Sequence, residues 1–345
     1  MTRCDKLRQS LKDNEGVLLS GYANIFYYTG FTSEDALVFI THDRQILITD
    51  SRYTVQAKSQ CPEFEIRDIS EGVAKIAARL DCEVLGFEEN VVTVSEFASF
   101  QKLGKKLVPM NQVISGPRRI KDDFEIKKIA AAEALGDRAF QNLLENFRYG
   151  MTEREIALEL EFYMRKNGAS GTSFETIVAS GKRSSMPHGV ATDKTVGIGE
   201  FVTIDFGCRL DGYCSDMTRT ILVGKCSDRQ KEIYDTVLKA QKAAISAIKP
   251  GVRCAEIDAV ARNIITEAGF GDNFGHSLGH SVGIEIHEKP NFAPKSEDIV
   301  EIGNVITVEP GIYIEGFGGV RIEDVIAVAE NTLNLTKTSK ELTIL

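Results

Sequence analysis

Several features that define common protein classes are missing from this sequence. The chain has no tryptophan and no C-x-x-C pair, and its seven cysteines are odd in number. This pattern predicts reduced, mostly buried thiols rather than a disulfide framework or a thiolate zinc site. No run approaches the ~18 apolar residues of a membrane span, and residues 1–14 lack the apolar core of a secretory signal. We therefore expect a cytoplasmic protein without a membrane partner.

Positive charge is also in deficit. Acidic residues outnumber basic ones by 50 to 41, which leaves a net charge of −9 and makes nucleic acid a poor partner. With 43% hydrophobic and 26% charged residues, the composition is that of a folded chain, and 345 residues are enough for two domains. Histidine is scarce: there are five, and four of them fall between residues 188 and 287.

Residues 1–117 alternate between strand-like and helix-like segments, which predicts a small α/β domain. The turn-like sequence Gly116-Pro117-Arg118-Arg119 then marks a boundary, so we expect a second domain over residues 118–345. Apolar runs of strand length occupy 16–20, 36–40 and 45–49, and helical spacing occupies 73–80 and 95–103.

The second domain opens with two helices and then becomes rich in strands, which predicts an α+β fold. A helical stripe of apolar residues follows Asp122, and Glu133 interrupts this stripe only at its edge. Thr152 and Glu155 form a capping-box pattern at the start of the next helix. Further helices are expected at residues 230–248 and 254–267.

A first hairpin brings two carboxylates together. The apolar strand at 201–205 ends on Asp205, and Asp211-Gly212 is a type I′ turn signal. A two-residue loop there places Asp205 opposite Thr218, with Asp216 on the same face as a diagonal neighbour ~7–8 Å away. Taken alone, this pair also fits two solvated acids on an exposed hairpin.

A second hairpin repeats the arrangement. The apolar strand at 305–309 ends on Glu309, and Glu323 lies at the same distance on the other side of Gly316. This symmetry predicts that the two glutamates face each other. Because like charges placed opposite one another destabilise a sheet, the pair fits a bound cation about as well as it fits two ordinary structural acids.

Three histidines lie between the hairpins: His276, His280 and His287. Glycine recurs at every fourth residue from 275 to 283, which predicts a loop followed by a strand. A lone histidine is usually an ordinary core or surface residue, but a cluster near paired carboxylates indicates a metal site. Four carboxylates and one imidazole would balance two divalent cations, and such a pair indicates metal-assisted hydrolysis.

These spacings resemble those of the pita-bread metallopeptidases. They are 11 residues from Asp205 to Asp216, 29 from His280 to Glu309 and 14 from Glu309 to Glu323. Over essentially its whole length the chain is similar to the Xaa-Pro peptidases aminopeptidase P and prolidase, which place an α/β domain before an α+β pita-bread catalytic domain. The resemblance implies that these five residues bind two divalent metal ions: Mn²⁺ first, with Co²⁺, Zn²⁺ or Fe²⁺ as alternatives. Asp216 and Glu323 would bind both ions, and Glu309 would also transfer protons.

The resemblance implies roles for further residues. His188, in a Pro-His-Gly segment, and His287 would position the scissile carbonyl and stabilise the oxyanion. His276 and Phe174 would line the pocket for the proline ring, and Arg321 would orient the ligands. The substrates would be peptides with proline at the second position, and the family habit implies a homodimer.

Two members of the family compete for the assignment. Prolidases act on dipeptides and tend to hold the substrate carboxylate with an arginine soon after the His-Glu motif. Here Glu288 is followed by Lys289, Pro290 and Asn291, and Lys295 is the next cation. We therefore expect an aminopeptidase P, with prolidase as the alternative at the same site.

Other classes fit less well. A catalytically inactive peptidase-like binding module would have lost ligand carboxylates, and this chain keeps them. Methionine aminopeptidase usually lacks the first domain, and creatinase lacks the metal. Loss of Xaa-Pro cleavage on removal of the metal or of Glu309 would separate a peptidase from a binding module.

Overall fold

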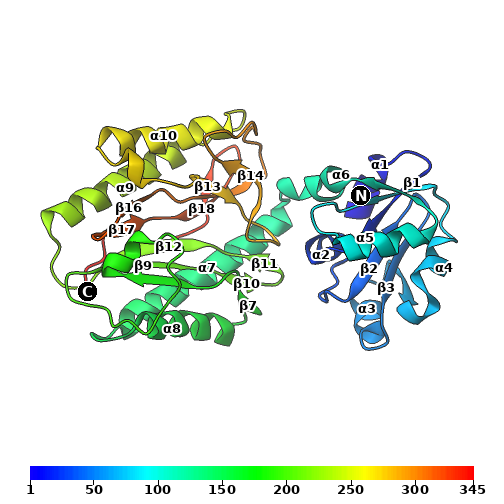
Figure 1. Cartoon of the computed structure of the whole chain (residues 1–345), viewed down its shortest axis with the longest axis horizontal. Coiled ribbons are helices and arrows are strands. Elements are labelled where there is room, and N and C mark those ends of the chain that lie inside the picture. Colours follow the sequence, from blue (N-terminus) through cyan, green and yellow to red (C-terminus); the bar gives the residue numbers. More distant parts are fainter. The chain divides into compact units, whose positions relative to one another are not determined.

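The computed structural model describes residues 1–345. Its Cα positions divide it into two compact units, Met1–Arg118 and Arg119–Leu345 (Figure 1). The predicted boundary between residues 117 and 118 is adjacent to this division. None of the helices combines the length and the apolar character that a membrane crossing requires. The seven cysteines are unpaired, and all except Cys226 are buried.

The N-terminal unit is built on one six-stranded sheet of order β4-β3-β2-β1-β5-β6. Its three central strands are antiparallel, and the other three join them in parallel. Apolar side chains such as Leu18 and Phe39 pack against Ile76 and Phe100 from the helices. The strands are β1 (Glu15–Leu19), β2 (Ala36–Ile40), β3 (Gln45–Thr49), β4 (Glu65–Asp68), β5 (Val84–Phe87) and β6 (Lys106–Pro109). The helices are α1 (Arg3–Gln9), α2 (Tyr22–Thr29), α3 (Thr54–Gln60), α4 (Val73–Ala77), α5 (Val94–Phe100) and α6 (Asn111–Ser115).

The C-terminal unit has two halves, and the first half packs two helices on a three-stranded sheet. Each helix begins with a capping box: the box of Thr152 was predicted, and Asp122 forms a second one with Glu125. Apolar residues such as Phe140 and Leu160 of the helices pack against Val202 and Ile204 of the sheet. The elements are α7 (Asp123–Asn146), α8 (Glu153–Lys166), β8 (Ile177–Ser180), β9 (Phe201–Phe206) and β12 (Met217–Leu222), with the short strands β7 (Gly171–Thr172), β10 (Cys208–Leu210) and β11 (Tyr213–Cys214).

The second half packs another helix pair against a five-stranded sheet of order β14-β13-β15-β18-β19. In Figure 1 the strands of both halves lie between the two helix pairs. The elements are α9 (Asp228–Ala247), α10 (Cys254–Glu267), β13 (Gly279–Ser281), β14 (Glu288–Phe292), β15 (Val305–Val308), β18 (Asp324–Ala327) and β19 (Leu333–Asn334), with the separate ribbon β16 (Gly311–Ile314) and β17 (Gly318–Arg321).

Both hairpins have the predicted register. Asp205 pairs with Thr218, and the turn residues Asp211 and Gly212 have φ values of 49° and 86°, as a type I′ turn requires. In the second half, the β15–β18 and β16–β17 ladders follow one common register centred on Gly316. Glu309 and Glu323 lie between these two ladders, where the register places them opposite one another.

The prediction for Glu133 was wrong. This residue does not lie at the edge of the apolar stripe of α7: its side chain is buried, with 1% of its surface exposed. Its carboxylate accepts hydrogen bonds from the backbone N–H of Asp216 (2.8 Å) and from the hydroxyl of Thr336 (2.9 Å). These bonds compensate for the loss of water, which explains how an acid is accommodated inside the core.

Candidate metal centre

A cavity of about 520 Å³ in the C-terminal unit is lined by every residue to which the sequence analysis assigned a site role. The β9–β12 hairpin and the second half each contribute predicted metal ligands. The structure therefore brings together side chains that lie far apart along the chain. These residues are Phe174, His188, Asp205, Asp216, His276, His280, His287, Glu309, Arg321 and Glu323.

His280 lies on a short strand that closely approaches its neighbour. Gly279 precedes it in β13, and a Cβ atom there would lie 2.0 Å from the carbonyl oxygen of Thr307 in β15. Only glycine permits this approach. The Nε2 atom of His280 then lies 3.5 Å from Asp216 Oδ2 and 3.5 Å from Glu309 Oε1.

The imidazole of His280 presents an unprotonated nitrogen to these carboxylates. Its Nδ1 lies 3.2 Å from the carbonyl oxygen of Ser281, so Nδ1 carries the hydrogen and Nε2 keeps its lone pair. Burial, together with the neighbouring His287 ring, lowers the pKa of His280 to about 4. A neutral imidazole with a free lone pair is the form that binds a metal ion.

The carboxylates have the properties expected of metal ligands. The ligand atoms of Asp216, His280 and Glu323 lie within 4.8 Å of one another. Burial raises the pKa values of Asp216 and Glu323 well above the ordinary range, and the neighbouring carboxylates raise them further. The Oδ1 atom of Asp205 is buried without a hydrogen-bond partner. Divalent cations would bind this oxygen and neutralise the charges, so the residues fit a metal site.

Glu309 is held by a threonine that the sequence analysis did not single out. Burial raises the pKa of Glu309 to about 8, although the charge of Arg321 acts in the opposite direction. The hydroxyl of Thr307 donates to Glu309 Oε1 at 3.2 Å and accepts the backbone N–H of His280 at 3.1 Å. One side chain thus sets the positions of two predicted ligands.

Arg321 contacts both the predicted ligands and the cavity wall. Its guanidinium donates to Asp205 Oδ2 at 2.5 Å, to the hydroxyl of Thr218 at 3.1 Å and to the hydroxyl of Tyr313 at 2.8 Å. The Thr218 hydroxyl in turn donates to Glu323 Oε2 at 2.6 Å. Arg321 therefore lies where it can orient carboxylates from both hairpins.

Tyr313 is a second residue that the sequence analysis missed. Its hydroxyl lies 2.9 Å from His276 Nε2, while His276 Nδ1 lies 2.8 Å from the carbonyl oxygen of Ser277. Nδ1 therefore carries the hydrogen, and Tyr313 donates to Nε2. Burial and the charge of Arg321 lower the pKa of His276 to about 4. Tyr313 lies four residues after Glu309 in an extended segment, and this even spacing was the available signal.

The remaining histidines lie toward solvent. His188 and His287 are exposed side chains in the lining of the cavity, and Phe174 is half-buried. The ring of His287 packs edge-on against that of His280, with 4.4 Å between the centroids. His42, which received no site role, is exposed in the N-terminal unit and bonds to the carbonyl oxygen of Lys12.

Two buried acids hold the loops that carry the cavity histidines. In the first half, Glu153 accepts the backbone N–H groups of Ser180 (2.8 Å) and Thr192 (3.1 Å), which flank the Pro-His-Gly segment. In the second half, Asp258 accepts the backbone N–H of Leu278 at 3.1 Å. Each half therefore uses an acid from its second helix to fix a histidine-bearing loop.

Comparison with known families agrees with this fold and site. Residues 127–330 match the model of metallopeptidase family M24, and residues 3–120 match the creatinase/prolidase N-terminal domain. The chain therefore belongs to metallopeptidase family M24, and it is a hydrolase. The predicted pita-bread architecture, with an α/β domain ahead of the catalytic domain, is confirmed.

The individual relatives include both dipeptidases and an aminopeptidase. The chain is 39% identical over 340 residues to an Xaa-Pro dipeptidase from Pyrococcus horikoshii, covering 95% of this chain and 94% of the relative. A solved Xaa-Pro dipeptidase from Bacillus anthracis superposes with a TM-score of 0.96 at 44% identity, covering 99% of each chain. A solved X-Pro aminopeptidase from Thermotoga maritima superposes with a TM-score of 0.93 at 38% identity, covering 99% of this chain and all (100%) of that one.

Proposed function

We propose that this protein is an Xaa-Pro dipeptidase that hydrolyses the bond before proline with two divalent metal ions. The observation that carries the proposal is the convergence of four carboxylates and the unprotonated Nε2 of His280 on one cavity. Similarity to Xaa-Pro dipeptidases over nearly the whole chain favours this alternative over the aminopeptidase P that the sequence analysis expected.

The metal ligands would be Asp205, Asp216, His280, Glu309 and Glu323. Asp216 and Glu323, which are the most deeply buried of these side chains, would be shared by both ions. Mn²⁺ is the first expectation, and Co²⁺, Zn²⁺ or Fe²⁺ also suit oxygen-rich ligands with one imidazole. When bound, the ions would polarise the scissile carbonyl and acidify a water molecule.

The other residues would bind the peptide and move protons. Glu309 would take up a proton on a carboxylate oxygen and deliver it to the proline nitrogen, which has no hydrogen of its own in the peptide bond. The exposed rings of His188 and His287 would position the carbonyl and stabilise the oxyanion. Neutral His276, whose ring nitrogens are both engaged, would pack with Phe174 against the proline ring.

One observation favours aminopeptidase P as a second candidate. Arg321 is the one arginine among the residues that line the cavity, and no lysine lines it. The guanidinium of Arg321 already bonds to Asp205, Thr218 and Tyr313. A dipeptide carboxylate would therefore have to bind without an unoccupied arginine or lysine, whereas a longer peptide would not place a carboxylate there.

The length of the preferred substrate separates the two candidates. We would measure kcat/KM of the enzyme loaded with Mn²⁺, Co²⁺ or Zn²⁺ for an Xaa-Pro dipeptide and for the matching Xaa-Pro-Yaa tripeptide. A dipeptidase should prefer the dipeptide by about tenfold or more, which corresponds to ~1.4 kcal/mol in the transition state. A preference for the tripeptide would establish aminopeptidase P instead.

A ligand variant tests the mechanism separately. Glu309→Ala should lower kcat/KM by about 1000-fold, because it removes both a ligand and a proton carrier. Equal cleavage by this variant, or by metal-free protein, would refute the proposed chemistry. His42→Ala is the matched control, since His42 lies in the N-terminal unit and should not affect cleavage.

We also propose a cytoplasmic homodimer, with an N-terminal domain over residues 1–117 and a catalytic domain over residues 118–345. The family resemblance supports the dimer, and the change in composition near residue 117 supports the boundary. Light scattering of the purified protein should give twice the mass of one chain. A value equal to one chain would rule out the dimer.

A further inference from the structure

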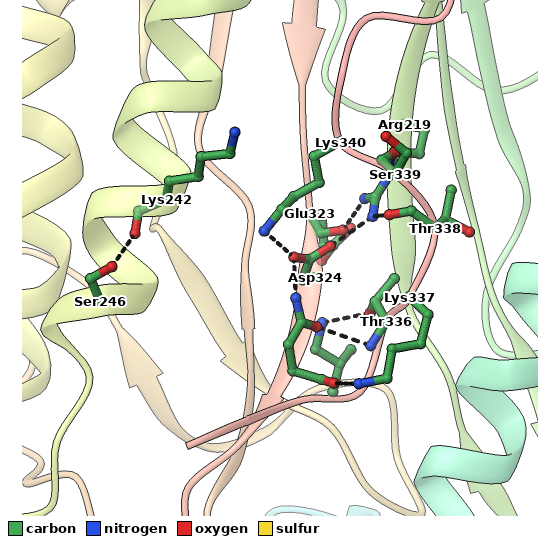
Figure 2. Close-up of polar contacts among 12 residues, drawn as sticks. Arg219, Lys242, Ser246, Glu323, Asp324, Thr336, Lys337, Thr338, Ser339 and Lys340 are labelled. Atoms are coloured by element: carbon green, nitrogen blue, oxygen red, sulfur yellow. Dashed lines mark hydrogen bonds and ion pairs between the residues drawn. The ribbon is translucent and has the colours of Figure 1, made fainter. Parts of the chain in front are cut away.

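The segment of residues 334–341, here named the C-terminal strap, begins at the last residue of β19, the last strand. It is pinned to α7, where Asp137 accepts the backbone N–H groups of Lys337 (2.9 Å) and Thr338 (2.7 Å). Figure 2 shows the strap passing Asp324 and Arg219, with several of its residues directed at them. None of these strap residues lines the cavity.

The first connection from the strap leads to Asp216. The Thr336 hydroxyl accepts the backbone N–H of Val325 at 3.0 Å and donates to Glu133 at 2.9 Å. Glu133 in turn accepts the backbone N–H of Asp216 at 2.8 Å. The side chains of Thr336, Glu133 and Asp216 are all buried. The strap therefore supports the backbone of one proposed shared ligand through a single intermediate residue.

The second connection leads to Glu323 through Arg219. This arginine is 2% exposed, and its Nε and Nη2 donate to the carbonyl oxygens of Ser339 (3.0 Å) and Thr338 (2.7 Å) in the strap. Its Nη1 donates to the carbonyl oxygens of Glu323 (2.5 Å) and Thr218 (2.8 Å). Arg219 thus fixes the backbone of Glu323 and of the threonine whose hydroxyl bonds to the Glu323 carboxylate.

Lys340 completes this second connection. Asp324, adjacent to Glu323, is buried and accepts hydrogen bonds from Arg219 (2.8 Å), Lys340 (2.6 Å) and Asn334 (2.7 Å), as Figure 2 shows for the two labelled cations. Two of these three donors belong to the strap. Without Lys340, Arg219 would be the one cation bonded to the buried carboxylate of Asp324. Arg219 also bonds to four backbone carbonyl groups.

We infer that the C-terminal strap positions Asp216 and Glu323, the two ligands shared by both metal ions, and thereby sets the affinity of the site. Thr336 and Lys340 are the positioning residues, one for each shared ligand. This inference rests on the proposed two-metal function. Residues that orient metal ligands typically contribute about 10- to 100-fold in metal affinity.

The test measures binding of Co²⁺ to metal-free, full-length protein by calorimetry and by its visible absorption spectrum. Thr336→Val removes the hydroxyl at nearly constant volume, and Lys340→Met removes the charge but keeps the aliphatic stem. Each should weaken Co²⁺ binding by about tenfold or more and alter the absorption bands. Thr336→Ser and Lys340→Arg should restore both properties.

Lys242→Met is the matched control. Lys242 lies on α9 and pairs with Glu341 of the strap at 2.9 Å, but both side chains are more than half exposed and neither contacts the ligand network. The Lys242→Met variant should bind Co²⁺ with the affinity and the absorption spectrum of the parent protein. If Thr336→Val and Lys340→Met also match the parent in affinity and spectrum, the strap inference is wrong. If one of these two variants does not fold, the Co²⁺ affinity of the other variant decides the test. A parent protein that binds no Co²⁺ would instead refute the proposed function.

Discussion

Each half of the C-terminal unit places a buried arginine on an acid of the other half. Arg219, from β12 in the first half, donates to Asp324 at 2.8 Å, while Arg321, from β17 in the second half, donates to Asp205 at 2.5 Å. Their exposed fractions are 2% and 3%. The exchange is reciprocal, so neither half has a complete electrostatic environment without the other.

The two arginines differ in what else they touch. Arg219 bonds to four backbone carbonyl groups besides Asp324 and does not line the cavity. Arg321 bonds to three side chains and to one backbone carbonyl, that of Pro187, and it does line the cavity. The same ion-pair exchange therefore serves two purposes. Arg219 joins segments of backbone, and Arg321 joins side chains of the cavity, among them the proposed metal ligand Asp205.

Removing one of the proposed shared ligands from each half gives the largest expected effect. Asp216→Asn and Glu323→Gln should each lower kcat/KM for an Xaa-Pro dipeptide by about 1000-fold, because a neutral amide cannot balance the metal charge. Steady-state kinetics at saturating Mn²⁺ would measure both. If only one variant loses activity, the halves are not equivalent in binding metal.

Exchanging the arginines for methionine should separate stability from activity. Arg219→Met leaves Asp324 short of a cation and should lower the free energy of unfolding by about 3–5 kcal/mol. Arg321→Met should lower kcat/KM by about 10- to 100-fold with a smaller change in stability. Urea unfolding followed by circular dichroism, together with kinetics, would measure both. If both variants lost the same free energy of unfolding, the proposed difference between Arg219 and Arg321 would be wrong.

Glu153, the acid that holds the histidine loop of the first half, should give a smaller effect with a defined pH dependence. Burial raises the pKa of Glu153, but hydrogen bonds from Thr192, Arg183 and Ser180 outweigh this and leave it below its ordinary value. A lowered folded-state pKa stabilises the protein above the unfolded pKa of about 4.3, and this contribution is lost as the pH falls through the folded pKa.

Glu153→Gln should therefore lower the free energy of unfolding by about 2–3 kcal/mol at pH 7, because it weakens bonds to a charged acceptor. The difference from the parent should shrink at acidic pH. Urea titrations at neutral and acidic pH would measure it, and a difference independent of pH would exclude the titration of Glu153 as the cause.

The threonines behind the ligands should give the smallest effects. The hydroxyl of Thr218 bonds to Glu323 at 2.6 Å, and that of Thr307 bonds to Glu309 at 3.2 Å. Because the shorter bond is the stronger, Thr218→Val should lower kcat/KM by about tenfold and Thr307→Val by about threefold. Kinetics at several Mn²⁺ concentrations would rank the two variants by their loss of kcat/KM. A larger loss for Thr307→Val would contradict the order expected from the bond lengths.

The hairpins could be predicted because short local signals determine their register. Asp211-Gly212 specifies one turn, and the symmetry about Gly316 specifies the other, so the positions of four carboxylates follow from spacing alone. The capping-box pattern of Thr152 and Glu155 similarly located the start of α8.

Other parts of the site depend on contacts between distant segments. An isolated acid such as Glu133 carries no local sign that it will be buried, because its two partners lie 83 and 203 residues away. Arg219 reaches the strap across 119 and 120 residues, again without a local pattern. The expectation of an aminopeptidase P relied on a missing arginine after the His-Glu motif, and overall similarity to dipeptidases favours the other member of the family.

The position of the strap along the chain has a consequence for how the enzyme acquires its metal. Because a protein is synthesised from its N-terminus, residues 334–341 emerge after every proposed ligand has been made. A nascent chain that ends shortly after Glu323 would possess the complete ligand set without the contacts that align two of its members. Tight metal binding should therefore follow the synthesis of the strap rather than that of the last proposed ligand.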